Sequence, residues 1–493
     1  MTHRPETSEF ATHMGRVGEA LDRFVAFDHP DAVASIDQWR PALDGPLPQT
    51  GVGADAVIDE FLDVVLPAGS RVSDPRFWAF ITAGPSTVPA VVAAAAQVGG
   101  VQRYTITAFN QLEELSLTWL AELCGLSPTM EGVYSSGGSV ANLLALGAAR
   151  QAACEAHGVD PASEGLGGAS LRIYASSEAH HTIQRAAGVL GIGRRAVQLV
   201  PIDSAQRMDP VALDAMLAAD IAAGCTPVAV VATAGTTNTG AIDPLRSIGE
   251  IARRHGAWFH VDGAYGLPGI LDERVAPLYD GLELADSAIV DPHKWLGAPS
   301  GIGATFVRDR AVLYRALTQE PADYLQGSFG ADDDVAMSFD AMGIPYADFG
   351  VELTAPPRGV VVWSILREIG VEGLRQRIVE DNDRARRIAE LADAHPRLES
   401  LTTPTLSIAC FRYVAPDGGD SDELNRHLLR RLRRTTSFLP SSTVLDGAFV
   451  IRPCFINVRT VDEDIEAFVE AVVRIGDELV GSRAGTTGDV IAG

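Results

Sequence analysis

Short apolar stretches alternate with helical patterns in the middle of the chain. The segments 227–233 and 258–261 are continuously apolar, which is typical of strands that are buried on both faces. Apolar residues that recur every three or four positions predict helices at 182–190, 210–223 and 245–254. Buried strands that are joined by helical crossovers predict an α/β fold with a parallel or mostly parallel sheet, covered on both faces.

The pattern changes in the last quarter of the chain. A long charged helix is predicted at 371–394, and strand-like segments follow at 407–413 and 449–453. Helical patterns at 422–434 and 463–479 accompany these strands. This mixture indicates a smaller α+β domain at the C-terminal end.

Together these patterns predict four consecutive parts. Residues 1–85 form an N-terminal helical segment that packs on a partner subunit, and residues 86–375 form the large domain. Residues 376–482 form the small α+β domain. Residues 483–493, rich in Gly and Thr, form a disordered tail.

The composition excludes several classes of protein. With 46% hydrophobic and 21% charged residues, the 493-residue chain is typical of a globular enzyme. A net charge of −25 disfavours binding to nucleic acid or to an anionic membrane. No apolar run approaches the ~20 residues that a membrane span requires. The N-terminus is polar and the five cysteines form no CxxC pair, so we expect a soluble, cytoplasmic protein without disulfides.

Lys294 is the single lysine among 39 basic residues. A genome that favours arginine codons explains why other lysines are missing, but it does not explain why this one remains. Arginine replaces lysine readily as a surface charge. It cannot replace lysine as a nucleophile, because a guanidinium does not deprotonate in proteins. The position therefore indicates a lysine that is needed for its chemistry.

Polar groups follow the ends of the predicted strands. A Ser-Ser-Gly-Gly-Ser segment at 135–139 precedes a helix, where backbone N–H groups can bind an anion. His180 and His181 follow the next strand, Gly-Thr-Thr at 235–237 follows another, and Asp262 ends a fourth. Carboxyl ends of parallel strands meet at one edge, where such sheets bind ligands.

Each of these features also has a purely structural interpretation. The Ser-Gly-Gly-Ser segment could be a turn with a serine N-cap, and His180 could be an ordinary structural histidine. Asp262 could pair with any of the arginines. The histidine pair could suggest a metal, but no third ligand stands at regular spacing, so we expect no metal site. As a set, however, the anion site, imidazole, carboxylate and lysine suit a phosphorylated pyridine aldehyde, namely pyridoxal phosphate.

The order and spacing of these motifs resemble those of the group II pyridoxal-phosphate-dependent decarboxylases, which act on aromatic amino acids, glutamate and histidine. The motifs are Ser-Gly-Gly-Ser, Ala-His, Gly-Thr-Thr, His-Val-Asp-Gly-Ala-Tyr-Gly and Asp-Pro-His-Lys-Trp-Leu. The resemblance runs from about residue 74 to about residue 477. It implies fold type I, the aminotransferase-like fold, and a homodimer whose active site lies at the subunit interface.

The resemblance also implies roles for single residues. Lys294 would form the internal aldimine, Asp262 would pair with the ring nitrogen, and His180 would stack on the ring. A substrate amine would then give an external aldimine, and loss of CO2 a quinonoid. The other cofactor-binding residues implied are Gly138, Ser139, Thr237, Ala264, Asp291 and His293, and the substrate pocket would include Pro85, Ser86 and Glu113.

Three positions depart from the usual pattern of the family. Val140 stands where many members have Glu, and Gly263 replaces the commoner Ala. Asp291 replaces an Asn of the aromatic decarboxylases. A carboxylate repels phosphate, so we expect Asp291 to point away from the phosphate site. The departures argue against a close match to the animal and plant aromatic decarboxylases.

One loop residue would decide the product. In the family, a loop tyrosine protonates Cα after CO2 has left, and relatives with phenylalanine there release an aldehyde. Counting back from Arg358 places Tyr346 at this position, whereas counting forward from Tyr324 brings Phe339 close to it. We favour Tyr346, because the anchor at Arg358 is the stronger one.

The sequence therefore predicts a decarboxylase that converts an L-amino acid, possibly an aromatic one, to its amine and CO2. Two alternatives stay within the same family, an aldehyde synthase and a carbon–carbon lyase. A remote alternative is a non-catalytic scaffold, against which the retained lysine argues.

Overall fold

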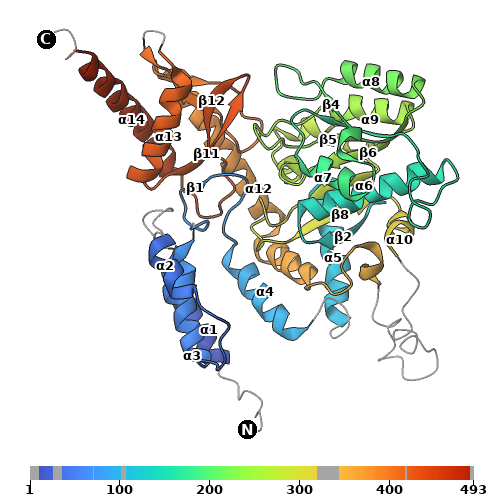
Figure 1. Ribbon diagram of the computed structural model, residues 1–493, viewed down its shortest axis with the longest axis horizontal. Coiled ribbons are helices and arrows are strands. Elements are labelled where there is room, and N and C mark those ends of the chain that lie inside the picture. Colours follow the sequence, from blue (N-terminus) through green and yellow to red (C-terminus); the bar gives the residue numbers. More distant parts are fainter. Residues whose placement is uncertain are drawn as a thin grey trace. The chain divides into compact units, whose positions relative to one another are not determined.

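The computed structural model describes residues 10–25, 36–69, 71–100, 107–318, 344–416 and 419–488 (Figure 1). The chain forms two compact units. The larger consists of residues 85–389 and 402–410, and the smaller of residues 1–84, 390–401 and 411–493. Among the described residues, no helix is both long and apolar enough to cross a bilayer.

The larger unit is built on a seven-stranded sheet with the order β2-β8-β7-β6-β5-β3-β4. Only β8 runs against its neighbours, so the sheet is mostly parallel, as the sequence predicted. Its central strands are buried along nearly their whole length, which explains their unbroken apolar sequences. The strands are β2 (Glu131–Ser135), β3 (Leu171–Ser176), β4 (Val197–Val200), β5 (Thr226–Thr233), β6 (Trp258–Asp262), β7 (Ser287–Val290) and β8 (Gly303–Val307).

Helix α6 (Gly138–Glu155) is the central helix of this unit. It lies against β2 and β5 to β8, and most of its residues are buried. Ala141, Ala145 and Ala149 give it small side chains that allow close approach to the sheet. The other helices of the unit are α4 (Thr87–Gly99), α5 (Thr107–Leu123), α7 (Thr182–Val189), α8 (Pro210–Ala222), α9 (Leu245–Arg254), α10 (Ala311–Leu317) and most of α12 (Arg358–Ala394).

The smaller unit contains a five-stranded sheet with the order β1-β11-β12-β10-β9. Trp78, on the edge strand β1, is fully buried, and its ring centroid lies 4.9 Å from that of Phe455 and 5.3 Å from that of Phe468. The strands are β1 (Phe77–Trp78), β9 (Leu398–Ser400), β10 (Phe411–Tyr413), β11 (Leu439–Leu445) and β12 (Ala448–Arg452), and the helices that accompany them are α13 (Ser421–Thr435) and α14 (Glu463–Gly488).

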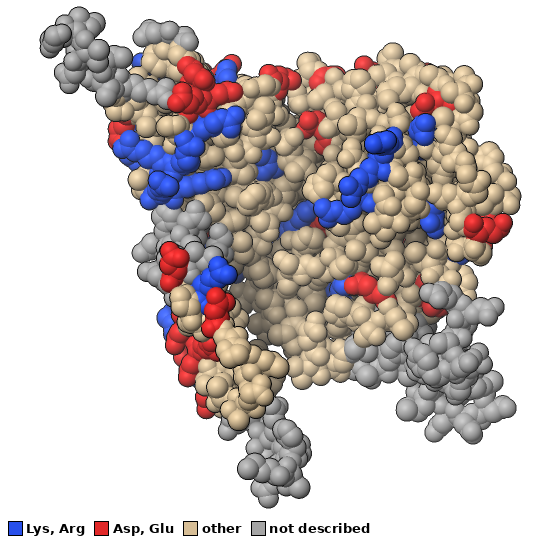
Figure 2. Space-filling model, in the orientation of Figure 1, with Lys and Arg blue, Asp and Glu red and all other residues tan. Residues whose placement is uncertain are grey.

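The same unit includes the N-terminal helices α1 (Phe10–Val25), α2 (Ile36–Leu43) and α3 (Ala54–Glu60), the last continued by η1 (Phe61–Val65) and η2 (Leu66–Ala68). Acidic side chains gather on these helices in Figure 2. Arg16 of α1 pairs with Asp55 and Asp59 of α3, which joins the two helices by charge.

Three elements differ from the patterns of the sequence. The predicted strand at 407–413 is restricted to β10, because the backbone N–H of Ser407 donates to the hydroxyl of Tyr265 at 3.1 Å rather than to a strand. The long charged helix predicted at 371–394 is preceded by a further helical segment that begins at Arg358, and the two meet at Gly370, whose φ of 68° is not helical. Helix α14 continues through Gly488, into the segment predicted to be a disordered tail.

Candidate active site

The carboxyl edge of the large sheet brings the candidate residues together. Thr233 at the end of β5 pairs with Asp262 at the end of β6, and Ser135 at the end of β2 pairs with Gly303. Lys294 follows β7 by only a few residues, and His180 follows β3 in the same way. Because these strands point the same way, residues that are far apart in the sequence share one edge.

Lys294 lies in a turn whose geometry is fixed by Asp291. Its backbone N–H donates to the carbonyl of Asp291 at 2.9 Å, and its amine lies 3.0 Å from Oδ2 of the same residue. The lysine side chain is 22% exposed, so a ligand can reach it, whereas the Asp291 side chain is 1% exposed. His293, beside the lysine, donates from Nδ1 to the carbonyl of Ile302 at 2.6 Å.

The N-terminus of α6 lies where the sequence predicts an anion site. Gly137 precedes it with φ of 119°, a conformation that favours glycine, and Gly138 and Ser139 form its first turn. A Cβ atom on Gly138 would lie 2.6 Å from Oδ2 of Asp291. The absence of that Cβ therefore lets the Asp291 carboxylate approach the start of the helix.

The expected orientation of Asp291 was wrong. The carboxylate does not point away from the α6 N-terminus but lies directly beside Gly138. The ion pair with Lys294 and the space left by Gly138 and Gly303 explain this position. The second oxygen, Oδ1, is buried and accepts no hydrogen bond from the described residues.

Each oxygen of the Asp262 carboxylate accepts a hydrogen bond. Its Oδ1 accepts the backbone N–H of Ala264 at 3.1 Å, and its Oδ2 accepts a hydrogen bond from the side-chain amide of Asn142 at 3.0 Å. The residue is only 5% exposed. Ala264 packs with Ala141 and Ala145 of α6, which closes the apolar side of this part of the site.

His180 is half-buried and accepts or donates one bond, between Nδ1 and the hydroxyl of Thr182 at 2.8 Å. Burial lowers its pKa below the usual value, and the negative charge of Asp262 opposes this shift only in part. The imidazole is therefore predominantly neutral at neutral pH. The ring of His181 lies 4.2 Å away.

The predicted residue Thr237 differs in exposure from its neighbours at the end of β5. Thr237 is exposed in the turn after β5, whereas its neighbour Thr236 is buried and bonds to the hydroxyl of Thr239 at 2.9 Å. The structure thus places Thr237 where a ligand can meet it. Thr233 is buried at the end of β5, and its hydroxyl has no hydrogen-bond partner among the described residues.

The predicted pocket residues lie around the loop that follows Lys294. The backbone N–H of Ser86 donates to the carbonyl of Gly297 at 2.9 Å, and the Ser86 hydroxyl is buried without a hydrogen-bond partner among the described residues. Pro85 beside it is half-buried. Glu113 is buried on α5 against Gly359, where a Cβ would lie 2.4 Å from its Cα.

Tyr346 is buried against α5 and Arg310. It begins η8 (Tyr346–Phe349) and its hydroxyl donates to Glu114, while Arg310 lies over its ring. Arg310 in turn bonds to Glu131, at the end of β2 opposite to Ser135. Burial and the bond to Glu114 both raise the pKa of Tyr346.

Phe339, the alternative to Tyr346, lies outside the described residues. The comparison of these two residues as the loop position therefore stays a prediction.

Comparisons with known proteins show the family to which the chain belongs. The pyridoxal-dependent decarboxylase conserved domain matches residues 37–414, which is most of the chain. The chain belongs to the pyridoxal-dependent decarboxylase family. It is therefore a lyase that uses pyridoxal phosphate to remove the carboxyl group of an amino acid.

Individual relatives extend this similarity over nearly the whole chain. An aromatic-L-amino-acid decarboxylase of Bacillus atrophaeus is 28% identical, over 90% of each protein. Tyrosine decarboxylase 2 of Arabidopsis thaliana is 30% identical over 86% of this chain and 78% of its own length. The Oryza sativa TDC solved with PLP and tryptamine covers 97% of this chain and 100% of its own, at 25% identity and a TM-score of 0.88.

The residues at the carboxyl edge fit pyridoxal phosphate. Lys294 would provide an amine for the aldehyde, and Asp262 a carboxylate whose two oxygens are already oriented. The start of α6 would provide backbone N–H groups for the phosphate. The buried, unpartnered hydroxyl of Thr233 is a further polar group at this edge. Only Asp291 is unfavourable, because it places a carboxylate beside the anion site.

Sequence reasoning missed the residues that support Asp262. Asn142, Thr182 and Ser287 are buried and hydrogen-bonded behind the site, together with His260. One signal was available: His260 and Asp262 are two positions apart on a strand, so their side chains share one face of the sheet. The contact of Asn142 with both could not be read from the sequence, because it depends on how α6 crosses β6.

Proposed function

We propose that the enzyme converts an aromatic L-amino acid to the corresponding amine and CO2. Relatives that cover most of the chain are an aromatic-L-amino-acid decarboxylase and a tyrosine decarboxylase. The observation that carries the proposal is the meeting of Lys294, Asp262 and His180 at one edge of the sheet.

In this proposal, each residue of the edge has one task. Lys294 is the residue to which the cofactor is covalently attached. Asp262 accepts a hydrogen bond from the protonated ring nitrogen. His180 packs on the ring as a neutral imidazole. Bound pyridoxal phosphate supplies an electron sink for the electrons that CO2 leaves behind. Around this group lie the proposed cofactor-binding residues Gly138, Ser139, Thr237, Ala264 and His293, whereas Asp291 pairs with Lys294 and disfavours the phosphate.

The proposed substrate pocket lies beside Lys294. Pro85, Ser86 and Glu113 line it, and the Ser86 hydroxyl is a buried polar group available to a substrate. The loop that carries Gly297 and Gly301 links Ser86 to Arg358, because Ser86 bonds to Gly297 and Arg358 bonds to Gly301.

The substrate is tested with purified enzyme and a panel of amino acids. From tyrosine, tryptophan or phenylalanine the enzyme should form one molecule of amine for each molecule of CO2. From glutamate or histidine it should form neither product. The matched control is Lys294→Arg, which keeps the charge and should be inactive on every substrate. Turnover of glutamate alone would contradict the aromatic assignment without contradicting the family.

Tyr346 is the proposed proton donor that makes amine the product. Its hydroxyl is bound to Glu114 on α5, the neighbour of the proposed pocket residue Glu113. The wild type should then consume no oxygen. Tyr346→Phe should release aldehyde, ammonia and peroxide in place of part of the amine. Stoichiometric oxygen uptake by the wild type would favour Phe339 at this position, and thus an aldehyde synthase.

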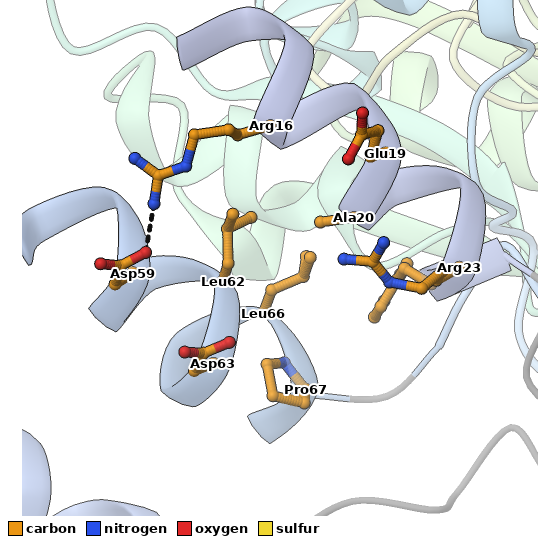
Figure 3. Close-up of a pocket in the computed structure, with 10 residues that line it drawn as sticks. Arg16, Glu19, Ala20, Arg23, Asp59, Leu62, Asp63, Leu66 and Pro67 are labelled. Atoms are coloured by element: carbon orange, nitrogen blue, oxygen red, sulfur yellow. Dashed lines mark hydrogen bonds and ion pairs between the residues drawn. The ribbon is translucent and has the colours of Figure 1, made fainter. Parts of the chain in front are cut away.

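A homodimer is part of the proposal, because the N-terminal helices lack a core of their own. Neither α3 nor η1 buries a residue, and Phe61 and Val65 are both 42% exposed. Figure 3 shows Leu62 and Leu66 lining a pocket between these helices and α1. A second copy of the chain would cover this apolar surface.

Light scattering after size exclusion tests the dimer. The wild type should have twice the mass of the 52.1 kDa chain, and Phe61→Ser with Val65→Ser should shift it toward monomer. Val211→Ser, at an exposed position on α8, is the matched control and should leave the dimer intact. A wild-type monomer at all concentrations would contradict the proposal.

We also propose a cytoplasmic location, since the five cysteines are all free thiols. Recovery of the enzyme only from an oxidising compartment would contradict it.

A further inference from the structure

Asn142 occupies the centre of a buried cluster of polar side chains. It is 1% exposed on the second turn of α6 and uses three of its hydrogen-bonding positions. Its side-chain NH2 donates to Oδ2 of Asp262 at 3.0 Å and to the hydroxyl of Thr182 at 3.2 Å. Its Oδ1 lies 2.9 Å from Nε2 of His260. One amide therefore contacts the carboxylate, a histidine and a hydroxyl at once.

These hydrogen bonds belong to a continuous series that runs from Trp258 to Asp262, and the two end groups fix the direction of every bond in it. At one end, the indole N–H of Trp258 can only donate, and it donates to the hydroxyl of Ser287 at 2.7 Å. At the other end, the carboxylate of Asp262 can only accept. The amide of Asn142 must therefore present its NH2 to Asp262 and its oxygen to His260, because the flipped amide would place two oxygens together.

The directions of the hydrogen bonds between these two end groups follow from them. His260 donates from Nε2 to the Asn142 oxygen, and its Nδ1 accepts the hydroxyl proton of Ser287 at 2.8 Å. His260 is fully buried, and this burial lowers its pKa to about 4, which keeps the ring neutral with a single proton. Every bond from Trp258 to Asp262 thus runs in one direction.

A branch of the same chain reaches His180. The Thr182 hydroxyl accepts from Asn142, so its own proton is available to Nδ1 of His180 at 2.8 Å. The neutral ring of His180 then carries its proton on Nε2. The orientation of the Asn142 amide consequently determines two properties of the proposed cofactor site: the orientation of the Asp262 carboxylate and the position of the proton on the His180 imidazole.

We propose that Asn142 is the positioning residue of the site, which holds Asp262 and His180 in one fixed arrangement at the end of a one-way chain of hydrogen bonds. With the backbone N–H of Ala264 on its other oxygen, the Asp262 carboxylate cannot rotate without breaking a buried bond. Such preorganisation removes the cost of reorienting the carboxylate when the cofactor binds. The inference rests on the roles proposed above for Asp262 and His180.

The first test compares Asn142→Leu with Thr305→Val. The leucine is similar in size to asparagine but makes no hydrogen bond. The control removes another buried hydrogen bond of α6, from the Thr305 hydroxyl to the carbonyl of Ala141 at 3.1 Å, without touching Asp262. Asn142→Leu should weaken the binding of pyridoxal phosphate, measured by absorbance titration, about tenfold and should lower kcat about tenfold at unchanged KM.

Thr305→Val should lower the melting temperature about as much as Asn142→Leu does. Its cofactor dissociation constant and kcat should stay within twofold of the wild-type values. Equal cofactor affinity in wild type and Asn142→Leu would overturn the proposal, as would equal losses in both variants, because the effect would then be one of stability alone. If Asn142→Leu does not fold, Ser287→Ala breaks the same chain farther from Asp262. It should give a smaller change of cofactor affinity in the same direction, and wild-type affinity in it would overturn the proposal.

The second test needs no cofactor. In the protein with 15N-labelled histidine, the resonances of His260, assigned through His260→Gln, should show a neutral ring with its proton on Nε2. A proton on Nδ1 would reverse the chain and overturn the proposal. A failure of the proposed roles has a different signature: the tautomer would be as expected, but Asp262→Asn would leave cofactor binding and turnover unchanged.

Discussion

The carboxyl edge of the sheet contains two buried carboxylates that differ in how they are held. Asp262 receives hydrogen bonds from neutral donors on both oxygens, from Ala264 and Asn142. Asp291 is paired through one oxygen with Lys294, and its other oxygen has no hydrogen bond from the described residues. The first carboxylate is therefore fixed before any ligand binds. The second depends on a cation that is itself the proposed reactive group.

This difference divides the site into a prepared part and a part that must change. Around Asp262 the buried polar groups are hydrogen-bonded to one another, so ligand binding leaves them in place. Around Asp291, attachment of Lys294 to the cofactor would change the partner of a buried charge, which is costly unless another partner appears. Substitutions in the two parts should accordingly have different effects.

The largest effect is expected for Lys294→Arg. The guanidinium can retain the ion pair with Asp291 but cannot attack an aldehyde, so turnover should fall below detection. Because Lys294 is the single lysine, borohydride reduction of the wild type should place the pyridoxyl group only on the tryptic peptide that contains it. Wild-type turnover in the variant, or label on any other peptide, would remove Lys294 from the proposed role.

The next effect is expected for Asp262→Asn, in the prepared part of the site. The amide keeps the shape of the carboxylate but not the charge that stabilises a protonated ring nitrogen. Turnover should fall roughly a hundredfold, the amount expected for loss of one charge-assisted contact in a dry site. Asp243→Asn is the matched control, because Asp243 is a buried carboxylate bound to two backbone N–H groups. It should lower stability but leave the absorbance of the bound cofactor unchanged.

Asp291→Asn tests the other carboxylate and should improve the site, in that it should strengthen cofactor binding. The substitution removes a negative charge beside the α6 N-terminus and also the ion pair that Lys294 must leave. Both changes favour the binding of a phosphate group, so the cofactor dissociation constant should decrease about tenfold. Asp309→Asn removes the same charge at an exposed position and should change nothing. Weaker binding in Asp291→Asn would show that the carboxylate supports the cofactor.

The comparison also shows what the sequence could and could not predict. The mostly parallel sheet followed from continuously apolar strands such as 227–233, because burial on both faces leaves a direct record in the sequence. The position of Lys294 and Asp262 at the ends of neighbouring strands could also be read from the sequence, whereas their roles stay predictions. The orientation of Asp291 could not, because it depends on the missing side chains of Gly138 and Gly303, which matter only after the chain has folded.

Contacts between distant segments were likewise beyond the sequence. Asn142 reads as one more residue of an Ala-rich helix, and its role appears only when α6 is packed across β6. Tyr346 was aligned by counting along a loop, but its position is set by Glu114 on another helix. In both cases the deciding partner is more than a hundred residues away along the chain.

The smallest effect is expected at neutral pH, where the prepared part should contribute no pH dependence of stability. Burial lowers the pKa of His260 to about 4, whereas an unfolded chain has a histidine pKa near 6.5. Between these two values the unfolded chain binds a proton that the folded chain does not. The contribution of His260 to the free energy of unfolding is therefore complete above about pH 6.5 and is lost as the pH falls toward 4.

Urea unfolding at a series of pH values measures this loss. The wild type should lose stability more steeply between pH 6.5 and 4 than His260→Gln, in which no ring can be protonated. His427→Gln, at an exposed position on α13, should retain the wild-type slope. The burial of His180 lowers its pKa as well, so part of the slope should persist in His260→Gln. Equal slopes in the wild type and His260→Gln would mean that burial does not lower the pKa of His260. A protonated ring would donate from Nδ1 as well as from Nε2, so the bond between Ser287 and His260 would no longer run toward Asp262.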